Sequence, residues 1–264
     1  MLRASQTPEY DQDMRHLLKR HPIPIRAFFR HSLVLTYAYP QEVLQPLLPP
    51  GLFLDTFQNV GFLAVAMVQT ERLRPAFLPE FAGKNFFLTG YRIFVRHRME
   101  GGRTLRGLRI LRSDTDQDTM VRFGNMLTHY NYRKADVKWT FDEPRLDIQI
   151  RTPQSEADLH VIAEIGKTPA PLPKGSPFAG LEEARRFAGP LPFTFDYEKE
   201  THSIIRIEGV RQDWNPLSVK VDIKENTFLD RPPFRNYPKR LANAFYIANV
   251  PYLWRKGIRT PLPE

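Results

Sequence analysis

Hydrophobic and polar residues alternate along much of this chain with the two-residue period of β-strands. The alternation is clearest in residues 145–151 and 159–165, two runs that a polar segment separates. Residues 86–99 and 104–112 form a predicted hairpin, because Gly101-Gly102 between them supplies the positive φ angles of a tight turn. Further strands are predicted for residues 27–39, 52–57, 61–70, 135–141, 202–210 and 218–223, with 52–57 and 61–70 pairing as a hairpin around Gln58-Asn59.

Helical patterns are few and short. A last helix is expected to begin near Pro238 and to end at Pro251, because Leu241, Phe245 and Ala248 fall on one helical stripe. Three other helices are predicted from Pro40 to Pro49, from Asp116 or Asp118 to about Leu127, and over residues 181–187.

The chain is interpreted as one domain, residues 1–264, because no shift in composition marks a linker. Residues 1–24 would form an N-terminal arm or helix, residues 28–260 a barrel, and residues 168–193 an inserted loop with a short helix. Strands joined by hairpins produce an antiparallel sheet, which closes into a barrel or folds over as a sandwich. The expected fold class is therefore mainly β (α+β), with a few short peripheral helices.

Composition restricts the chemistry. The chain has no cysteine, which excludes disulfides and thiolate metal sites and fits a reducing cytoplasm. The seven histidines lack metal-binding spacing, and no nucleotide-binding glycine motif or Gly-x-Ser-x-Gly elbow occurs, so neither a metal nor another cofactor is expected. The longest apolar run, residues 62–68, is too short to span a bilayer. We expect a cytoplasmic protein without stable membrane association.

The formal charge of +9 is concentrated in residues 84–112, which carry eight Lys and Arg residues against one acid. On a strand through residues 91–99, Arg92 and Phe94 share one face and Ile93 the other. The basic face has three interpretations: a solvated surface, a site for an anionic ligand, or a nucleic-acid surface. No zinc-finger spacing, Gly-rich RNA-binding motif or long basic tail supports nucleic acid, and we expect none.

Residues 124–134 concentrate polar and aromatic side chains in one short segment. Burial of such a cluster costs free energy unless each polar atom finds a partner, so it indicates a ligand pocket or a well-connected polar core. His129 is a candidate base because its ordinary pKa is near neutral; the alternative is a structural donor at a helix end. The candidate ligand-binding residues are Arg92, Ser113, Asp114, Tyr130 and Asn131, and the candidate catalytic residues are His129 and Lys134.

Several motifs together resemble one bacterial family of uncharacterised proteins. They are Tyr39-Pro-x-x-x-Leu44-x-x-Leu47-Leu48-Pro49-x-Gly51-Leu52 with Leu54-Asp55-Thr56, then Tyr91-Arg92-Ile93-Phe94-Val95, then Tyr130-Asn131-Tyr132. Their order over roughly residues 28–260 is similar to that of domain of unknown function 2071, which is grouped with the acetoacetate decarboxylase-like superfamily. The resemblance implies a cone-like or barrel-like antiparallel sheet around a central cavity.

The superfamily's decarboxylase chemistry uses a lysine beside a second lysine, which forms a Schiff base with a keto acid. Such an amine must be desolvated and next to another cation to be neutral near pH 7. The segment that should hold the lysine pair reads His129-Tyr130-Asn131-Tyr132, and Arg92 stands where a glutamate is expected. We therefore do not expect acetoacetate decarboxylase activity.

The predicted function is binding of a small anionic organic molecule inside the barrel. Arg92 would pair with the acid group, and His129, Tyr130 and Asn131 would hydrogen-bond the remainder. The alternative is a lyase, decarboxylase or hydrolase that acts on a keto acid-like substrate through Lys134 as amine or His129 as base. The aromatic tail at residues 251–256 would pack across the sheet edge, with a homodimer contact or a transient membrane contact as alternatives.

Overall fold

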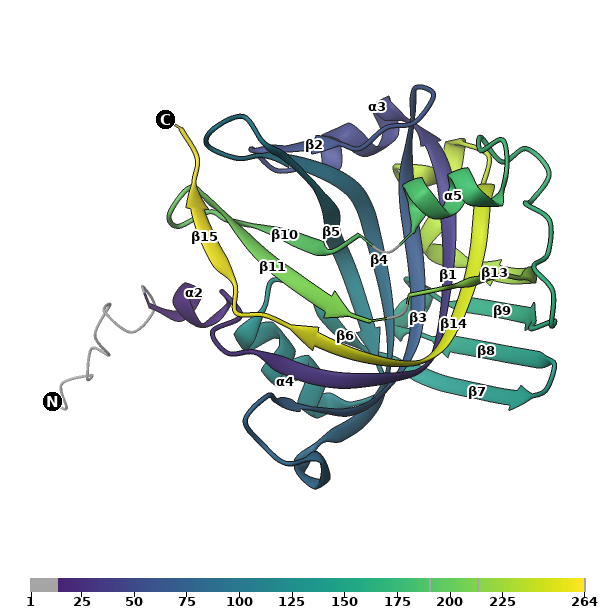
Figure 1. Cartoon of the computed structure of the whole chain (residues 1–264), viewed down its shortest axis with the longest axis horizontal. Coiled ribbons are helices and arrows are strands. Elements are labelled where there is room, and N and C mark those ends of the chain that lie inside the picture. The colour runs from purple at the N-terminus through teal and green to yellow at the C-terminus, as the bar shows by residue number, and fades with distance from the viewer. Residues whose placement is uncertain (1–13, 190, 213, 264) are drawn as a thin grey trace, which may run out of the picture.

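The computed structural model describes residues 14–189, 191–212 and 214–263. Its centre is a closed ring of seven strands, in the order β14-β1-β3-β4-β5-β10-β11, which β11 and β14 complete by pairing with each other (Figure 1). The prediction of a mainly β fold with a few short helices is confirmed. The ring strands are β1 (Ile25–Pro40), β3 (Val60–Pro75), β4 (Lys84–Arg98), β5 (Thr104–Thr115), β10 (Phe193–Glu198), β11 (Ser203–Arg211) and β14 (Arg240–Trp254).

The odd number of strands has a topological consequence. Up-and-down alternation cannot close around seven strands, so one neighbouring pair must be parallel. That pair is β5 and β10, which meet only through Phe193 opposite Gly107 and Thr194 opposite Leu108. The other neighbours in the ring are antiparallel, as the hairpin pattern predicted.

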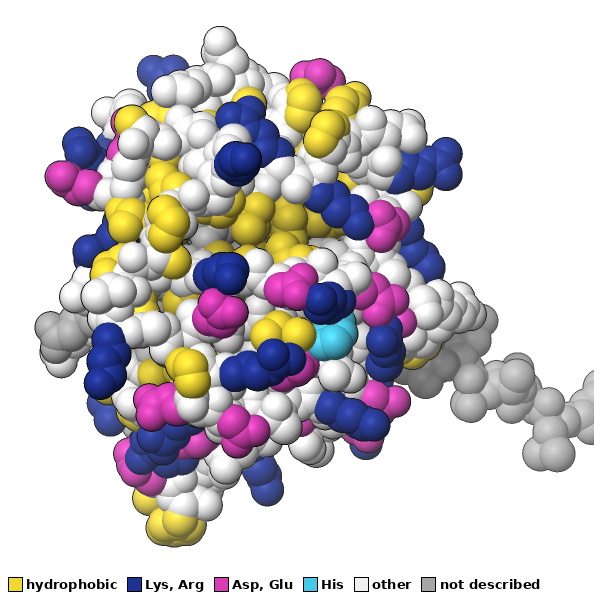
Figure 2. Space-filling model, turned by 90° about the vertical axis from the view of Figure 1, so that its right-hand side faces the viewer, with side chains coloured by type: hydrophobic (Ala, Val, Ile, Leu, Met, Phe, Trp, Pro, Cys, Tyr) yellow, Lys and Arg dark blue, Asp and Glu magenta, His cyan; other side chains and the backbone are white. Residues whose placement is uncertain are grey.

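A second sheet lies against the outside of the ring. It has four strands in the order β13-β9-β8-β7, and side chains of both charge signs are mixed on the side of the molecule where it lies (Figure 2). The strands are β7 (Asp136–Asp142), β8 (Arg145–Arg151), β9 (Leu159–Glu164) and β13 (Lys220–Asn226). The predicted pairing of residues 145–151 with 159–165 is confirmed.

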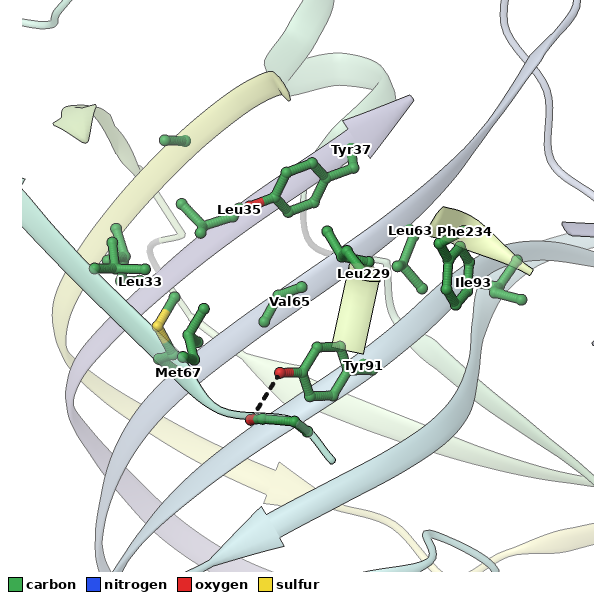
Figure 3. Packing of buried hydrophobic residues seen from close by; sticks show 14 of the residues in the cluster. Leu33, Leu35, Tyr37, Leu63, Val65, Met67, Tyr91, Ile93, Leu229 and Phe234 are labelled. Atoms are coloured by element: carbon green, nitrogen blue, oxygen red, sulfur yellow. Dashed lines mark hydrogen bonds between the residues drawn. The ribbon is translucent and has the colours of Figure 1, made fainter. Parts of the chain in front are cut away.

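The main hydrophobic core joins the two sheets. Leu33, Val65 and Ile93 point from the ring strands into this core, which also contains Ile148 and Val161 of the second sheet (Figure 3). All five side chains are fully or almost fully buried. At about 25 cal/mol per Å² of apolar surface removed from water, this interface is a major source of the free energy of folding.

Short helices and strands complete the fold. Predicted helices after Pro40, toward Leu127 and near residues 181–187 are confirmed, as is the hairpin of residues 86–99 with 104–112. No helix in the described residues is long and apolar enough to cross a membrane. These elements are α2 (Arg15–Leu18), α3 (Gln41–Leu44), η1 (Gln45–Leu47), β2 (Leu52–Leu54), η2 (Glu80–Ala82), α4 (Asp118–Leu127), β6 (Tyr132–Lys134), η3 (Pro153–Ser155), α5 (Leu181–Ala188), β12 (Leu217–Ser218), η4 (Thr227–Asp230), η5 (Phe234–Asn236) and β15 (Ile258–Pro261).

The predicted C-terminal helix is wrong, because those residues form β14. Residues 242–246 of β14 are all buried, so both faces of the strand are covered there. Its apolar residues therefore need not alternate and can imitate a helical stripe. The segment becomes a strand because it pairs with β1 along its whole length, from Ile25 opposite Trp254 to Ala38 opposite Arg240.

Two smaller predictions also need correction. The turn predicted at Gln58-Asn59 is confirmed, because Phe57 and Val60 bridge across it, but the strand before it does not continue the hairpin. β2 pairs with β4 instead, with Leu52 opposite His97. Residues 1–13 of the predicted arm lie outside the described residues, and the part that follows contains α2.

Gly107 allows β5 and β10 to approach each other. A Cβ at this position would lie 2.6 Å from the carbonyl oxygen of Phe193 and 2.5 Å from the ring of Phe195. We predict that Gly107→Ala lowers the free energy of unfolding by about 1–3 kcal/mol, the usual cost of overpacking. Urea denaturation measures the change. Gly166→Ala is the matched control, because Gly166 lies outside the helices and strands and its Cβ would make only an ordinary contact, 3.5 Å from the carbonyl oxygen of Thr168. Equal stability of the two variants would contradict the role of Gly107.

Candidate functional site

A cavity of about 120 Å³ lies inside the ring. Its walls come from the inner faces of β1, β3, β4, β5 and β14, from the C-terminal end of α5, and from Trp214 and Pro216 between β11 and β12. Most of the residues around it are apolar, among them Phe94, Leu108 and Ile110.

The cavity exists because small residues of neighbouring strands are in register. Val34 of β1 lies opposite Ala66 of β3, Ala66 opposite Gly90 of β4, and Gly90 opposite Ser113 of β5. Alternation along β3 sets the large residues Leu63, Val65 and Met67 against the second sheet, whereas Ala64 and Ala66 face the interior of the ring. The small side chains on the inner face of β3 therefore leave space inside the ring, whereas the large side chains on its outer face fill the contact with the second sheet.

Arg92 of β4 places a cation in this cavity. Its Nε is buried without a hydrogen-bond partner, and no carboxylate of the described residues forms an ion pair with it. Burial lowers the pKa of Arg92, and the hydroxyls of Tyr252, Tyr130 and Tyr132 oppose that shift. The side chain as a whole is half-buried, with its Nε fully buried. Because arginine remains protonated in proteins, the result is a largely enclosed positive charge without a counterion among these residues.

Gly90 provides the room for the guanidinium. A Cβ on Gly90 would lie 2.9 Å from Nε of Arg92 and 3.1 Å from its Nη2. The ring of Tyr132 lies in the same way against Gly124 of α4, and the hydroxyl of Tyr252 against Gly209 of β11. Close approach over glycine therefore fixes three polar side chains that line the cavity.

Hydroxyl groups surround the guanidinium. Burial raises the pKa of Tyr132 to about 12, against the opposing effect of Arg92, and raises the pKa of Tyr130 well above its usual range. Both phenols therefore stay protonated at neutral pH and can donate hydrogen bonds. The Tyr130 hydroxyl is buried beside the Thr194 side chain. Ser32, Ser113 and Thr194 add further hydroxyl-bearing side chains to the lining.

Four neighbouring arginines on β4 and β5, Arg96, Arg106, Arg109 and Arg112, differ from Arg92 because each of them has an acidic partner. Arg96 and Arg106 both donate to the fully buried carboxylate of Asp55, each over 2.5 Å. Arg106 also donates to the carbonyl oxygen of Phe187 (2.9 Å) and lies 4.4 Å from the centre of its ring. Asp55 thereby ties α5, whose end closes one side of the cavity, to the ring.

The predicted site residues divide into two groups. Arg92, Ser113 and Tyr130 line the cavity together. The remaining four, Asp114, Asn131, His129 and Lys134, are not among its lining residues.

Asp114 and Asn131 are held by protein contacts. Asp114 pairs with Arg112 (2.8 Å), and Arg112 also pairs with Glu156 (2.7 Å). Burial raises the pKa of Asp114 to about 6, although Arg112 opposes the shift. Asn131 is exposed in a left-handed backbone conformation (φ 52°), and its amide donates to the carbonyl oxygen of Leu111 (3.1 Å).

Lys134 and His129 also lie elsewhere. The Lys134 amine donates to the carbonyl oxygen of Asp116 (2.8 Å) and approaches Asp118 (3.4 Å), with 42% of its side chain exposed. His129 is half-buried beside Asp196, and burial lowers the pKa of His129 while the Asp196 carboxylate opposes the shift. Its Nε2 is buried without a partner among the described residues. His129, Asp196 and Arg109 thus form a polar cluster distinct from the cavity lining.

No group of three or more His, Cys, Asp or Glu residues in the described part of the chain is arranged to hold a metal ion.

The family of uncharacterised conserved proteins called domain of unknown function 2071 has a model that matches residues 26–251. The chain belongs to this family. The resemblance inferred from the ordered motifs is thereby confirmed. A search of curated proteins gave no match.

Solved structures show that this family member shares the acetoacetate decarboxylase-like fold. An acetoacetate decarboxylase from Legionella pneumophila aligns with a TM-score of 0.61 at 13% identity, over 90% of this chain and 88% of that chain. The enduracididine biosynthesis enzyme MppR in complex with pyruvate gives 0.60 at 13% identity, over 90% of each chain. An acetoacetate decarboxylase-like enzyme from Sphingomonas wittichii gives 0.59 at 12% identity, over 90% and 94%.

Sequence reasoning missed several cavity residues of this family member. Thr194 directly followed the supposed inserted loop, and Tyr252 followed the supposed helix, so neither was assigned to a ring strand. Arg211 and Trp214 were not weighed as site residues. The signal for Ala64 and Ala66 was present, since large and small residues alternate from residue 63 to 67, but it marks a cavity only once both faces of β3 are known to be covered.

We predict that Arg92→Met raises the free energy of unfolding by about 1–3 kcal/mol, because it removes an uncompensated buried cation and its desolvation cost. Thermal and urea denaturation without ligand measure the change. The matched control is Arg112→Met, which leaves Asp114 buried without its partner and should lower stability by about 3 kcal/mol or more. A loss of stability in Arg92→Met as large as in the control would show that the protein itself compensates the Arg92 charge.

Proposed function

We propose that the cavity binds a small organic anion whose acid group pairs with Arg92. The observation that carries this proposal is a guanidinium that lines a largely apolar cavity without a carboxylate partner among the described residues. An isolated buried charge is costly, and a carboxylate that accepts two of its N–H groups would offset that cost. The protonated Tyr130 and Tyr132 hydroxyls supply further donors beside it.

The size and lining of the cavity support a compact ligand with an apolar body. An engineered apolar cavity of about 150 Å³ holds a benzene molecule. A cavity of about 120 Å³ therefore encloses roughly five or six non-hydrogen atoms, and the rest of a longer acid would lie in its opening. Phe94, Leu108 and Ile110 would contact its hydrocarbon part. MppR, which shares the fold, has been crystallised with pyruvate, a small acid of the same chemical class.

The alternative is a lyase or hydrolase that acts on a keto acid. No lysine occurs among the described residues that line the cavity, and the Lys134 amine is bound at the surface by Asp116 and Asp118. Borohydride treatment with pyruvate or acetoacetate is therefore expected to leave no adduct on Lys134. A trapped adduct, located by peptide mass spectrometry, would establish Schiff-base chemistry and favour the alternative.

The basic stretch at residues 84–112 gives little support to nucleic-acid binding. Four of its arginines are paired with carboxylates, and Arg92 lies in the cavity. On the face in Figure 2, Lys and Arg side chains lie among Asp and Glu side chains, so this face carries no large field of one sign.

We predict that short carboxylic acids bind the protein through Arg92. At one hundred times its dissociation constant, an acid should raise the free energy of unfolding by about 2.7 kcal/mol. Arg92→Met should abolish this ligand-induced shift, which thermal denaturation with butyrate, hexanoate and benzoate measures. Gly90→Ala should weaken binding at least about tenfold, because its Cβ displaces the guanidinium without touching the ligand.

Arg98→Met is the matched control, because Arg98 lies on the same strand but is exposed. It should retain the full shift. An undiminished shift in Arg92→Met would remove Arg92 from the site and contradict the proposed function.

A further inference from the structure

A second cation, Arg211 at the end of β11, also lines the cavity. Its Nη1 donates to the Tyr252 hydroxyl (3.2 Å), and its guanidinium lies 5.0 Å from the ring centre of Trp214 and 5.7 Å from that of Tyr252. No carboxylate of the described residues forms an ion pair with it. Contacts with aromatic rings and one neutral hydroxyl therefore hold Arg211, and they leave most of its five N–H groups unused.

The two cations share one environment. Tyr252 lies beside both guanidinium groups, and the positive charge of Arg211 adds to the lowering of the pKa of Arg92. A ligand with one negative charge would leave the occupied cavity with one uncompensated cation. A second negative charge would neutralise it.

We propose that the natural ligand is a dianion, with one acidic group at Arg92 and a second at Arg211 on a short apolar body. The inference rests on the proposed function and specifies its ligand class. The rigid, planar fork of a guanidinium that aromatic rings hold in place suits an acid group with two equivalent oxygens, as in a carboxylate or a phosphate. Both chemistries satisfy the two cations, so the test distinguishes them.

The experiment compares acids of equal chain length with one and two carboxylates. Isothermal titration at pH 7.5, where both carboxylates are ionised, and at constant ionic strength gives dissociation constants for three pairs. The pairs are butyrate with succinate, valerate with glutarate, and hexanoate with adipate. Methyl phosphate and inorganic phosphate form a separate arm for doubly charged phosphates.

The wild-type protein should bind at least one diacid about tenfold or more tightly than its matched monoacid. Arg211→Gln removes the second charge and should bring the two affinities within about twofold, because the diacid loses more affinity than the monoacid. Arg211→Lys, which keeps the charge, should retain part of the preference. Arg206→Gln is the matched control, because Arg206 lies on the same strand against Phe193 and does not line the cavity.

Each outcome decides between the proposals. Equal binding of monoacids and diacids by the wild-type protein would overturn the dianion inference and leave the proposed function intact. A preference that survives in Arg211→Gln would also overturn it. No binding of any acid would overturn both. Tight binding of methyl phosphate without a diacid preference would assign the two charges to one phosphate group. Should Arg211→Gln fail to fold, the wild-type ratios and Arg211→Lys still decide.

Discussion

The alternation of side chains across the ring strands is the constraint on which the rest of the structure depends. Protein interiors normally pack as densely as organic crystals, so an internal cavity has to be reconciled with a stable core. Here one face of the ring strands packs the core, and the opposite face lines the cavity. Leu63, Val65 and Met67 fill the contact with the second sheet, while Ala64 and Ala66 leave the inside of the ring open. Because the larger core lies outside the ring, the cavity can change its lining without loss of the main source of stability.

Closure of the ring adds a second requirement, because seven strands cannot all be antiparallel neighbours. The parallel contact of β5 with β10 is short, and Gly107 is needed for the close approach. Near this contact, the buried carboxylate of Asp55 binds Arg96 and Arg106, and Arg106 holds Phe187 of α5. This connection gives a physical reason for the Leu54-Asp55-Thr56 motif: it fixes the helix end that closes the cavity.

The sequence predicted the mainly β fold, most strands of both sheets apart from β10 and β14, and Arg92, Ser113 and Tyr130 as candidate residues that do line one cavity. Local alternation and turn chemistry were sufficient to predict these features, because each feature depends on residues that are close together in the sequence. The partner of β2 and the strand character of β14 were not, since both depend on pairing with residues far away in the chain. Asp114, Asn131, His129 and Lys134 were selected for residue type and closeness in sequence. The alternation that sets Arg92 inward says nothing about which face Lys134 occupies after the turn at Asn131.

The arginines illustrate why charge alone could not locate the site. Arg92, Arg96, Arg109 and Arg112 all lie on two adjacent strands, and sequence gives no reason to treat them differently. Their partners distinguish them. Arg96, Arg109 and Arg112 pair with the carboxylates of Asp55, Asp196 and Asp114, respectively. Arg92 and Arg211 instead face the cavity beside neutral hydroxyls. Removal of a paired arginine leaves its carboxylate buried without a partner and is expected to lower the free energy of unfolding. Removal of Arg92 removes the desolvation cost of an unpaired cation and is expected to raise it. Selection for stability alone would thus favour the loss of Arg92. A residue that is expected to lower the stability of the protein needs another role, and this is the physical argument behind the proposal that Arg92 binds a ligand.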